Sequence, residues 1–240
     1  MIIGISGKMG SGKDLSGLMI QYLTSSYKDK YHFEDWHERV VKHGSKTHSP
    51  FITKKFADKL KDMVCVMLSC TRAQLEDRDF KETPLSEEWW LFTDGISITP
   101  YLGGDTRMLD GYNTSVQKTT PRLLLQLLGT DCGRYILHPN VWVNSLMSEY
   151  EDIHELSTFG HEPLFPDWVI TDVRFPNEAD AILSKGGIVL RVNRPPVVVV
   201  PDFTVEHASE TSLDNYQKFT ALLDNSKTKK HLLEQIKSFV

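Results

Sequence analysis

A glycine-rich segment near the start of the chain has the composition of a phosphate-binding loop. Gly7, Gly10 and Gly12 lead to Lys13 in the pattern glycine, four residues, glycine, lysine. Glycines permit positive φ angles and close approach of the backbone, so consecutive N–H groups can point at phosphate oxygens while Lys13 contacts the β- and γ-phosphates. We expect residues 7–14, here called the phosphate loop, to bind a nucleoside triphosphate. The simpler interpretation is a glycine-rich turn before a helix.

Asp14 departs from the usual pattern, in which serine or threonine follows the lysine. A carboxylate beside a triphosphate is repelled unless Mg²⁺ or water lies between them, or unless the carboxylate serves a second substrate. Asp14 is therefore a candidate both for the metal shell and for binding an acceptor.

A second acidic position follows an apolar segment, 168–171, that is typical of a buried strand. Asp172 at its end is placed to deliver a carboxylate to Mg²⁺ at the carboxyl edge of a sheet. Arg174 projects the same way if the chain stays extended, and its planar fork suits a transferring phosphoryl group. A surface pair at a strand end is the alternative. Glu178 either holds a sugar hydroxyl or favours the dipole of the helix that begins there.

Polar residues recur every fourth position in the middle of the chain, at Arg122, Gln126, Thr130 and Arg134. We predict a helix from Pro121 to Leu128 with Gly129 as its C-cap. If the helix continues, the four polar side chains share one face, which either clamps an acceptor phosphate or is simply solvated. Trp142 is equally suited to the core and to stacking on a base.

The elements that must position these residues alternate between strands and helices. Strands are expected at 2–5, 51–56, 168–171, 188–192 and 219–223. Helices are expected at 14–27, 57–70, from Pro139 onward, from Asn177 onward and at 226–240. This alternation predicts an α/β protein with a central parallel sheet covered on both faces.

Two segments show little periodicity. Residues 28–50 are rich in charge and histidine, and because His37, His43 and His48 lack a metal-ligand spacing we expect a solvated loop. Residues 83–120 are expected to be an insertion of turns, with room for a hairpin. Arg194, together with Arg191, flanks a strand end at which small kinases often carry a lid.

Bulk composition narrows the class of protein. The net charge of −5 argues against generic binding to nucleic acid, which needs a basic surface. No apolar run approaches the ~18 residues of a membrane span. Cys65, Cys70 and Cys132 form neither a disulfide framework nor a zinc spacing, and we expect Cys65 and Cys70 to be buried thiols. A single cytoplasmic domain is the resulting expectation.

Taken together, these motifs resemble the deoxynucleoside monophosphate kinases of tailed bacteriophages. The resemblance covers most of the chain except residues 24–50 and 84–118. It rests on the phosphate loop, Phe56-Ala57, Pro121-Arg122, 126–131, Gly133-Arg134, 171–178, Glu206-His207 and Ser209-Glu210. Leu15 stands where the family often has threonine, which leaves the composition of the Mg²⁺ shell open.

This resemblance implies a P-loop kinase fold of three α/β/α layers, with ATP and Mg²⁺ as cofactors and deoxynucleoside monophosphates as acceptors. It implies an acceptor region at about 55–150 and a lid at about 194–212. The implied ATP-binding residues are Gly7, Gly10, Ser11, Gly12, Lys13 and Asp14. The implied acceptor-binding residues are Asp14, Arg122, Gln126, Gly129, Thr130, Trp142, Asp172, Arg174 and Glu178. The implied catalytic residues are Lys13, Asp172 and Arg174, and the implied metal ligands are Asp14 and Asp172, partly through water.

Two other functions remain open at this stage. Kinases of dephospho-coenzyme A or phosphomevalonate share the loop and often the aspartate. A nucleotide-gated switch protein would also bind a triphosphate, but it would need no second ligand. The polar residues of 122–134 favour a second ligand and so argue against a switch. Small nucleotides are the expected partners, and the residues leave open whether the chain forms a homodimer.

Overall fold

The computed structural model describes residues 1–93, 98–100, 115–152, 164–195 and 208–240. The chain divides into two compact units: Met1–Phe56 with Val143–Val240, and Ala57–Trp142. Each unit is described by itself below. The expected single domain stays a prediction, and most of the expected lid lies outside the described residues.

The first unit is built on a five-stranded sheet in the order β2-β6-β1-β7-β8. All four strand pairs are parallel. The strands are β1 (Ile2–Ser6), β2 (Ile52–Lys54), β6 (Trp168–Val173), β7 (Ile188–Asn193) and β8 (Ala221–Asp224). Every residue of β1 is buried, as expected for a central strand that is covered on both faces. The five expected strands and the parallel sheet are therefore confirmed.

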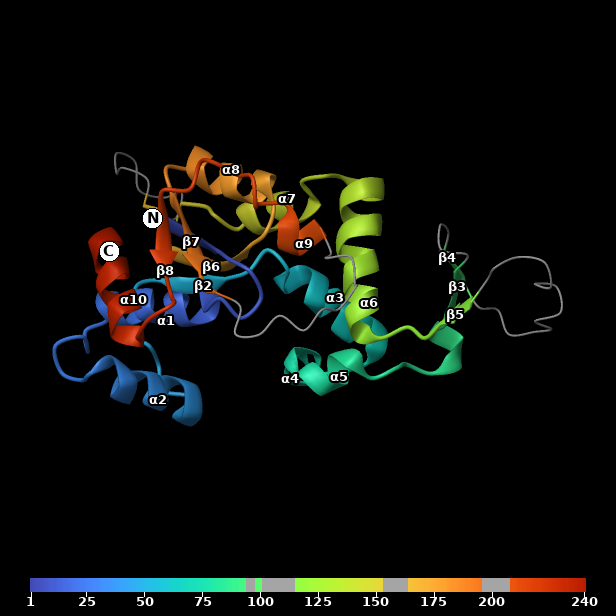
Figure 1. Ribbon diagram of the computed structural model, residues 1–240, viewed down its shortest axis with the longest axis horizontal. Helices are drawn as coiled ribbons and strands as arrows, with labels where there is room; N and C mark the ends of the chain where they lie inside the picture. The colour runs from blue at the N-terminus through green and yellow to red at the C-terminus, as the bar shows by residue number, and fades with distance from the viewer. Residues whose placement is uncertain (94–97, 101–114, 153–163, 196–207) are drawn as a thin grey trace. The chain divides into compact units, whose positions relative to one another are not determined.

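Helices cover both faces of this sheet (Figure 1). The helices of this unit are α1 (Lys13–Thr24), α2 (Phe33–His43), α8 (Pro176–Ser184), α9 (Ala208–Thr211) and α10 (Lys229–Ile236), followed by a 3-10 turn at Lys237–Phe239. Helix α7 (Val141–Met147) begins in the last two residues of the second unit and continues into the first. α1 and α10 lie on one face and α8 on the other. A Cβ on Gly4 would lie 2.6 Å from Ile182 of α8, and one on Gly17 of α1 would lie 2.6 Å from Thr171. Glycine at these two positions lets α8 and α1 approach the strands closely.

The core of the first unit lies between the sheet and the layer of α1, α2 and α10. Its buried members are Ile3, Ile5, Met19, Ile20, Tyr22, Phe33, Trp36, Phe51, Val169, Leu190, Val192, Leu223, Leu232 and Ile236. Full burial of one such aliphatic side chain is worth about 1.5–3 kcal/mol, so this cluster is the main source of the unit's stability.

The expectation of a solvated loop at 28–50 is wrong for its middle part, which forms α2. Phe33 and Trp36 are buried and Val40 packs against the same cluster, so the apolar residues recur at helical spacing. Acidic residues occupy the first turn and basic residues the last, which suits the helix dipole. Gly44 ends the helix with a left-handed φ of 63°. The segment contains many charged residues and only a few apolar ones, so its short apolar stripe is difficult to recognise in the sequence.

The second unit contains short helices and a small antiparallel sheet. Its helices are α3 (Asp58–Leu68), α4 (Arg72–Glu76), α5 (Arg78–Glu82), the 3-10 turn η1 (Glu87–Trp89), α6 (Pro121–Gln126) and the π-helix η3 (Leu127–Leu137). Its strands β3 (Leu91–Thr93), β4 (Ile98–Pro100) and β5 (Ser115–Gln117) pair in the order β4-β3-β5. The β3–β4 pair is antiparallel, which confirms the expected hairpin.

The predicted C-cap at Gly129 is wrong, because α6 continues directly into η3. A glycine C-cap needs a left-handed φ, and Gly129 is not among the described glycines with positive φ. The lack of a side chain serves packing instead, since a Cβ on Gly129 would lie 2.8 Å from Leu60. The helix therefore runs from Pro121 to Leu137, and the polar residues 122, 126, 130 and 134 lie along one continuous helical segment.

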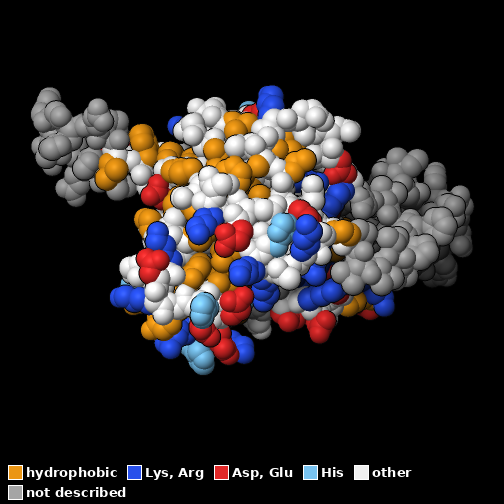
Figure 2. All heavy atoms as spheres, turned by 60° about the vertical axis from the view of Figure 1, so that its left-hand side comes forward, with side chains coloured by type: hydrophobic (Ala, Val, Ile, Leu, Met, Phe, Trp, Pro, Cys, Tyr) orange, Lys and Arg blue, Asp and Glu red, His pale blue; other side chains and the backbone are white. Residues whose placement is uncertain are grey.

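The surface carries both signs of charge. Basic and acidic side chains are interspersed on the face shown in Figure 2. No helix within the described ranges is long and apolar enough to cross a membrane. Cys65, Cys70 and Cys132 are free thiols. The expectation that Cys65 and Cys70 are buried is wrong, because both thiols are half-buried; Cys65 lies in α3 and Cys70 follows it.

Candidate nucleotide site

The phosphate loop joins β1 to α1 and is held in shape by a distant residue. Gly10 and Gly12 adopt left-handed φ angles of 74° and 101°. The side-chain amide of Asn225, just after β8, donates a 2.7 Å hydrogen bond to the carbonyl of Ser11. A Cβ on Gly12 would lie 2.6 Å from the same Asn225 nitrogen. Glycine at position 12 is therefore required both by the backbone angle and by this buried contact.

The loop presents donors without protein acceptors. Among the described residues, the backbone N–H groups of Gly10, Gly12 and Lys13 have no hydrogen-bond acceptor. The Ser11 hydroxyl is buried and also lacks a partner there. Unpaired amides at the start of a helix carry partial positive charge and attract anions. This geometry fits the phosphate-binding role predicted from the glycine pattern.

Lys13 lies against the loop. Its Nζ donates to the carbonyl oxygens of Gly7, at 2.6 Å, and Lys8, at 2.9 Å. Burial, and next the nearby guanidinium of Arg174, lower the pKa of Lys13 from 10.5 to about 8. Its ammonium group is thus an incompletely balanced cation beside the unpaired loop amides, as an anion site requires.

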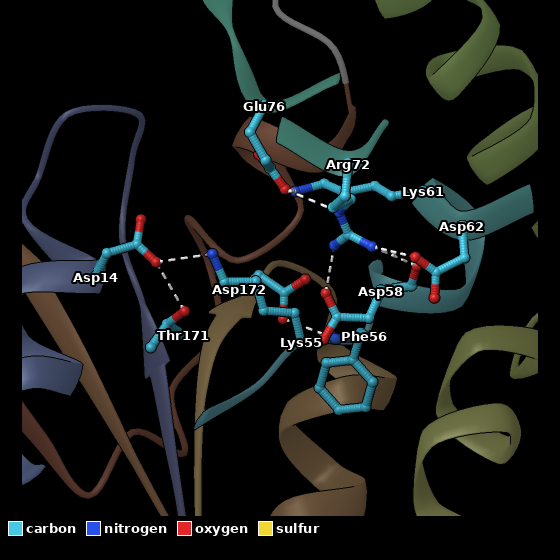
Figure 3. A network of polar contacts seen from close by, with 10 residues as sticks. All are labelled: Asp14, Lys55, Phe56, Asp58, Lys61, Asp62, Arg72, Glu76, Thr171 and Asp172. Atoms are coloured by element: carbon cyan, nitrogen blue, oxygen red, sulfur yellow. Dashed lines mark hydrogen bonds and ion pairs between the residues drawn. The ribbon is translucent and has the colours of Figure 1, made fainter. Parts of the chain in front are cut away.

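Asp14 interacts with two neighbours that bracket its carboxylate (Figure 3). Its Oδ1 accepts a hydrogen bond of 2.9 Å from Thr171 in β6 and forms an ion pair of 3.0 Å with Lys55, just after β2. Desolvation by the surrounding protein opposes ionisation of Asp14, but Lys55, Thr171 and Lys13 together outweigh it and hold the pKa of this carboxyl below its usual value. Lys55 was not among the residues predicted from the sequence. Its only signal there is its place at the end of a predicted strand.

Asp172 lies near the carboxyl end of β6, as predicted. Its Oδ1 accepts a 2.8 Å hydrogen bond from the backbone N–H of Phe56, which follows β2 (Figure 3). The contact ties the end of β2 to the end of β6. Whether Asp172 also binds metal stays a prediction.

Arg174 and Glu178 have distinct roles at the start of α8. One carboxylate oxygen of Glu178 accepts hydrogen bonds from the backbone N–H groups of Arg174, at 2.7 Å, and Phe175, at 3.0 Å. Glu178 is buried and caps the helix, in line with the helix-end alternative. Its contact with a sugar stays a prediction. The guanidinium of Arg174 reaches Glu210 in α9, at 2.5 Å.

Arg191 and the segment after α9 complete the polar shell of the loop. Arg191 in β7 donates to the Ser6 hydroxyl at 3.0 Å and to Asp214 at 3.1 Å. Asp214 also pairs with Lys8 of the loop at 2.8 Å. These contacts were not anticipated, because no local pattern links residues between 23 and 206 positions apart.

The predicted acceptor residues of the middle segment lie in the second unit. Arg122 pairs with Glu82, and Gln126 is half-buried. Thr130 is buried. Trp142 is 7% exposed and donates its indole N–H to the Gly129 carbonyl at 2.7 Å, so the core interpretation of Trp142 is the one observed. Elsewhere in this unit, Arg72 joins Asp58, Asp62 and Glu76 (Figure 3).

The predicted site residues thus divide between the two units, and within the second unit a hydrogen bond joins Trp142 to Gly129. Lys13, Asp14, Asp172, Arg174 and Glu178 belong to the first unit, while Arg122, Gln126, Gly129, Thr130 and Trp142 belong to the second. Glu206 and His207 lie outside the described residues.

A parallel sheet with a glycine-rich loop between its central strand and the following helix defines the class. This is an α/β fold with a central parallel sheet and helices on both sheet faces, consistent with the P-loop fold of nucleoside monophosphate kinases.

Comparison with known proteins agrees with this class. No family model matches the chain. The chain is 35% identical over 128 residues to a putative deoxynucleotide monophosphate kinase of Acanthamoeba polyphaga mimivirus, a match that covers 50% of this chain and 61% of the relative. It is 26% identical over 231 residues to the deoxynucleoside-5'-monophosphate kinase of Escherichia phage T5, covering 89% of this chain and 85% of the relative. The resemblance to viral kinases of this kind is confirmed.

Proposed function

We propose that this chain is a deoxynucleoside monophosphate kinase, which transfers the γ-phosphoryl group of ATP to a deoxynucleoside monophosphate and yields ADP and a deoxynucleoside diphosphate. The observation that carries the proposal is the phosphate loop with Lys13 and Arg174 beside it, in a chain similar to proteins named as such kinases. A reducing compartment, such as the cytoplasm, suits its three free thiols.

Catalysis in this proposal rests on positioning and on neutralisation of charge. The acceptor phosphate oxygen is already ionised at neutral pH, so it attacks the γ-phosphorus in line with the departing ADP oxygen without a strong base. Lys13 and Arg174 offset the charge that spreads over the equatorial oxygens. The loop amides hold the donor in place.

Mg²⁺ fits the oxygen donors near the loop. Carboxylates are the ligands that this ion prefers, usually one or two per site together with water and phosphate oxygens. Asp14 and Asp172 would hold the ion, partly through water, and the ion would supply further charge neutralisation. Ser11, whose buried hydroxyl has no partner among the described residues, is a further candidate oxygen.

The acceptor is assigned to the residues named by the resemblance. Arg122, Gln126 and Thr130 would bind its phosphate and base, with Gly129 and Trp142 as the wall behind them. Because the Trp142 indole N–H is already bonded to Gly129, the contribution of Trp142 is to shape rather than to hydrogen bonding. Asp14, Asp172, Arg174 and Glu178 would face the acceptor phosphate and sugar.

The direct test is ADP release from ATP and Mg²⁺ with a panel of nucleoside and deoxynucleoside monophosphates, dephospho-coenzyme A and phosphomevalonate. We expect release that depends on deoxynucleoside monophosphates. Lys13→Ala should lower kcat by about a hundredfold or more, since it removes a preorganised charge from the transition state. Release with another acceptor alone would favour the related kinases. Slow hydrolysis that no acceptor stimulates would favour a switch protein.

A further inference from the structure

Residue Glu210 joins two parts of the candidate nucleotide site. One carboxylate oxygen accepts a 3.0 Å hydrogen bond from the backbone N–H of Met9, at the crown of the phosphate loop. The other accepts from the Arg174 guanidinium at 2.5 Å, and the Ser209 hydroxyl lies 3.3 Å from the same nitrogen. A single side chain thus spans the loop and the arginine that follows β6.

The contact differs from an ordinary surface ion pair. Exposed pairs contribute little, because water screens the charges and long side chains lose conformational freedom. Here the Glu210 side chain is only 22% exposed and one of its two oxygens is fixed by a backbone amide. A carboxylate anchored in this way restricts the flexible Arg174 side chain to one orientation. Glu178 fixes only the backbone of Arg174, so the guanidinium depends on α9 for its position.

Glu210 also balances charge near Lys13. Arg174 lowers the pKa of Lys13, whereas Glu210 raises it. Two cations can therefore remain charged side by side at neutral pH because a carboxylate is held next to them.

We propose that Glu210 is a positioning residue that holds the Arg174 guanidinium against the phosphate loop, so that it meets the phosphoryl group during transfer. The inference rests on the proposed kinase function. It assigns Glu210 no contact with substrate. The rival assignment is that the Glu210 carboxylate occupies the place of a phosphate and must leave when ATP binds. In that case removal of the carboxylate tightens ATP binding and does not lower kcat.

The experiment compares Glu210→Ala, Glu210→Gln and Arg174→Ala with the wild type. Steady-state rates give kcat and the KM of ATP, and calorimetry gives the Kd of ATP. Glu210→Ala should lower kcat about 10- to 100-fold, the range seen when a supporting hydrogen-bond partner is removed, and should leave the KM of ATP within about threefold. Glu210→Gln keeps one acceptor oxygen, for either Met9 or Arg174. Its kcat should therefore lie between that of the wild type and that of Glu210→Ala. Glu234→Gln, at an exposed position on α10, is the matched control and should change neither constant.

A double mutant separates positioning from general damage. If Glu210 acts through Arg174, the Glu210→Ala, Arg174→Ala double variant should be no slower than Arg174→Ala alone. Losses in kcat that multiply would overturn the proposal. A Glu210→Ala protein that keeps wild-type kcat, or that binds ATP more tightly at unchanged kcat, would overturn it in favour of the phosphate-mimic role. Equal melting temperatures exclude misfolding as the cause.

Crystal structures of the wild type and Glu210→Ala supply a readout that does not need turnover. We expect the Arg174 guanidinium to leave the loop in the variant, and an unchanged guanidinium overturns the inference. If the wild type shows no turnover with any acceptor, the proposed function fails, and these structures still decide whether Glu210 positions Arg174.

Discussion

At the scale of single residues, the pKa of Lys13 connects pH to nucleotide binding. Burial and Arg174 bring this pKa to about 8 in the free protein, and a bound triphosphate raises it again by favouring the ammonium form. Below pH 8 Lys13 is already charged. Above pH 8 ATP must bind together with a proton, so its affinity falls as the pH rises, by up to about tenfold per unit.

Calorimetry of ATP binding from pH 7 to pH 10 measures this slope. Lys13→Arg serves as the control, because arginine stays charged throughout and its ATP affinity should not fall in this range for want of a proton. A wild-type affinity that stays constant up to pH 10 would contradict the assignment of Lys13 to the phosphates.

Lys55 and its neighbour Lys54 offer a matched pair. Their side chains are similarly exposed, at 28% and 27%, but Lys55 pairs with Asp14 whereas Lys54 pairs with Glu149. Lys55→Met removes the ion-pair partner of Asp14, so the negative carboxylate repels the phosphates of the incoming ATP more strongly. We expect the KM of ATP to rise about three- to tenfold, since the added repulsion amounts to about 1 kcal/mol. Lys54→Met should leave it unchanged, and equal effects of the two substitutions would argue against a role for the Asp14–Lys55 pair.

At the scale of elements, two glycines of the phosphate loop differ in the space around them. Both Gly10 and Gly12 have positive φ, but a Cβ on Gly10 meets nothing within 4 Å whereas one on Gly12 meets Asn225. Gly10→Ala should cost about 1–2 kcal/mol of backbone strain. Gly12→Ala adds the loss of the Asn225–Ser11 hydrogen bond, about 1–2 kcal/mol more, and distorts the loop.

Chemical denaturation and ATP calorimetry on both variants test this difference. Gly12→Ala should be the less stable protein and should lose measurable ATP binding, while Gly10→Ala should still bind. Equal stability of the two would show that Asn225 does not constrain the loop.

The elements nearest the loop could be predicted because their signals are local. An apolar run, a glycine pattern and a helical repeat fall within the first 24 residues, and the strand before Asp172 is equally continuous. α2 escaped prediction because its apolar stripe is narrow and its surroundings are charged. The π-helix escaped because a glycine inside a helix is locally indistinguishable from a C-cap.

The partners of the site residues were beyond the reach of local pattern. Lys55, Asn225 and Glu210 approach the loop from strands or helices that are remote in sequence. Which remote residue faces a loop depends on strand order and register, and no short motif encodes either. The elements around the loop could therefore be predicted from the sequence, whereas the contacts of the loop residues could not.

At the scale of the whole molecule, the proposed acceptor residue Arg122 and the proposed donor-binding loop lie in different compact units, so we expect that a substitution at Arg122 alters acceptor binding alone. Arg122 lies in the second unit and pairs with Glu82, whereas the phosphate loop lies in the first. Arg122→Ala should raise the KM of the deoxynucleoside monophosphate about tenfold, through loss of a charged hydrogen bond to its phosphate, and leave the Kd of ATP unchanged.

Glu82→Ala is the informative companion, because it removes the partner of Arg122 but keeps the guanidinium. Acceptor KM should then be unchanged or lower. If both substitutions weaken the acceptor equally, Arg122 supports the local structure rather than the substrate.

The place of β1 in the sheet has a consequence for how the chain is made. Among the described strands it pairs with β6 and β7, which are translated more than 160 residues after it. Its three isoleucines must wait without these neighbours until β6 and β7 have been translated, a period in which exposed strands tend to aggregate. Asn225, which secures the loop, arrives later still. A ribosome-bound fragment would therefore lack the Asn225–Ser11 hydrogen bond that secures the phosphate loop until residue 225 has been translated.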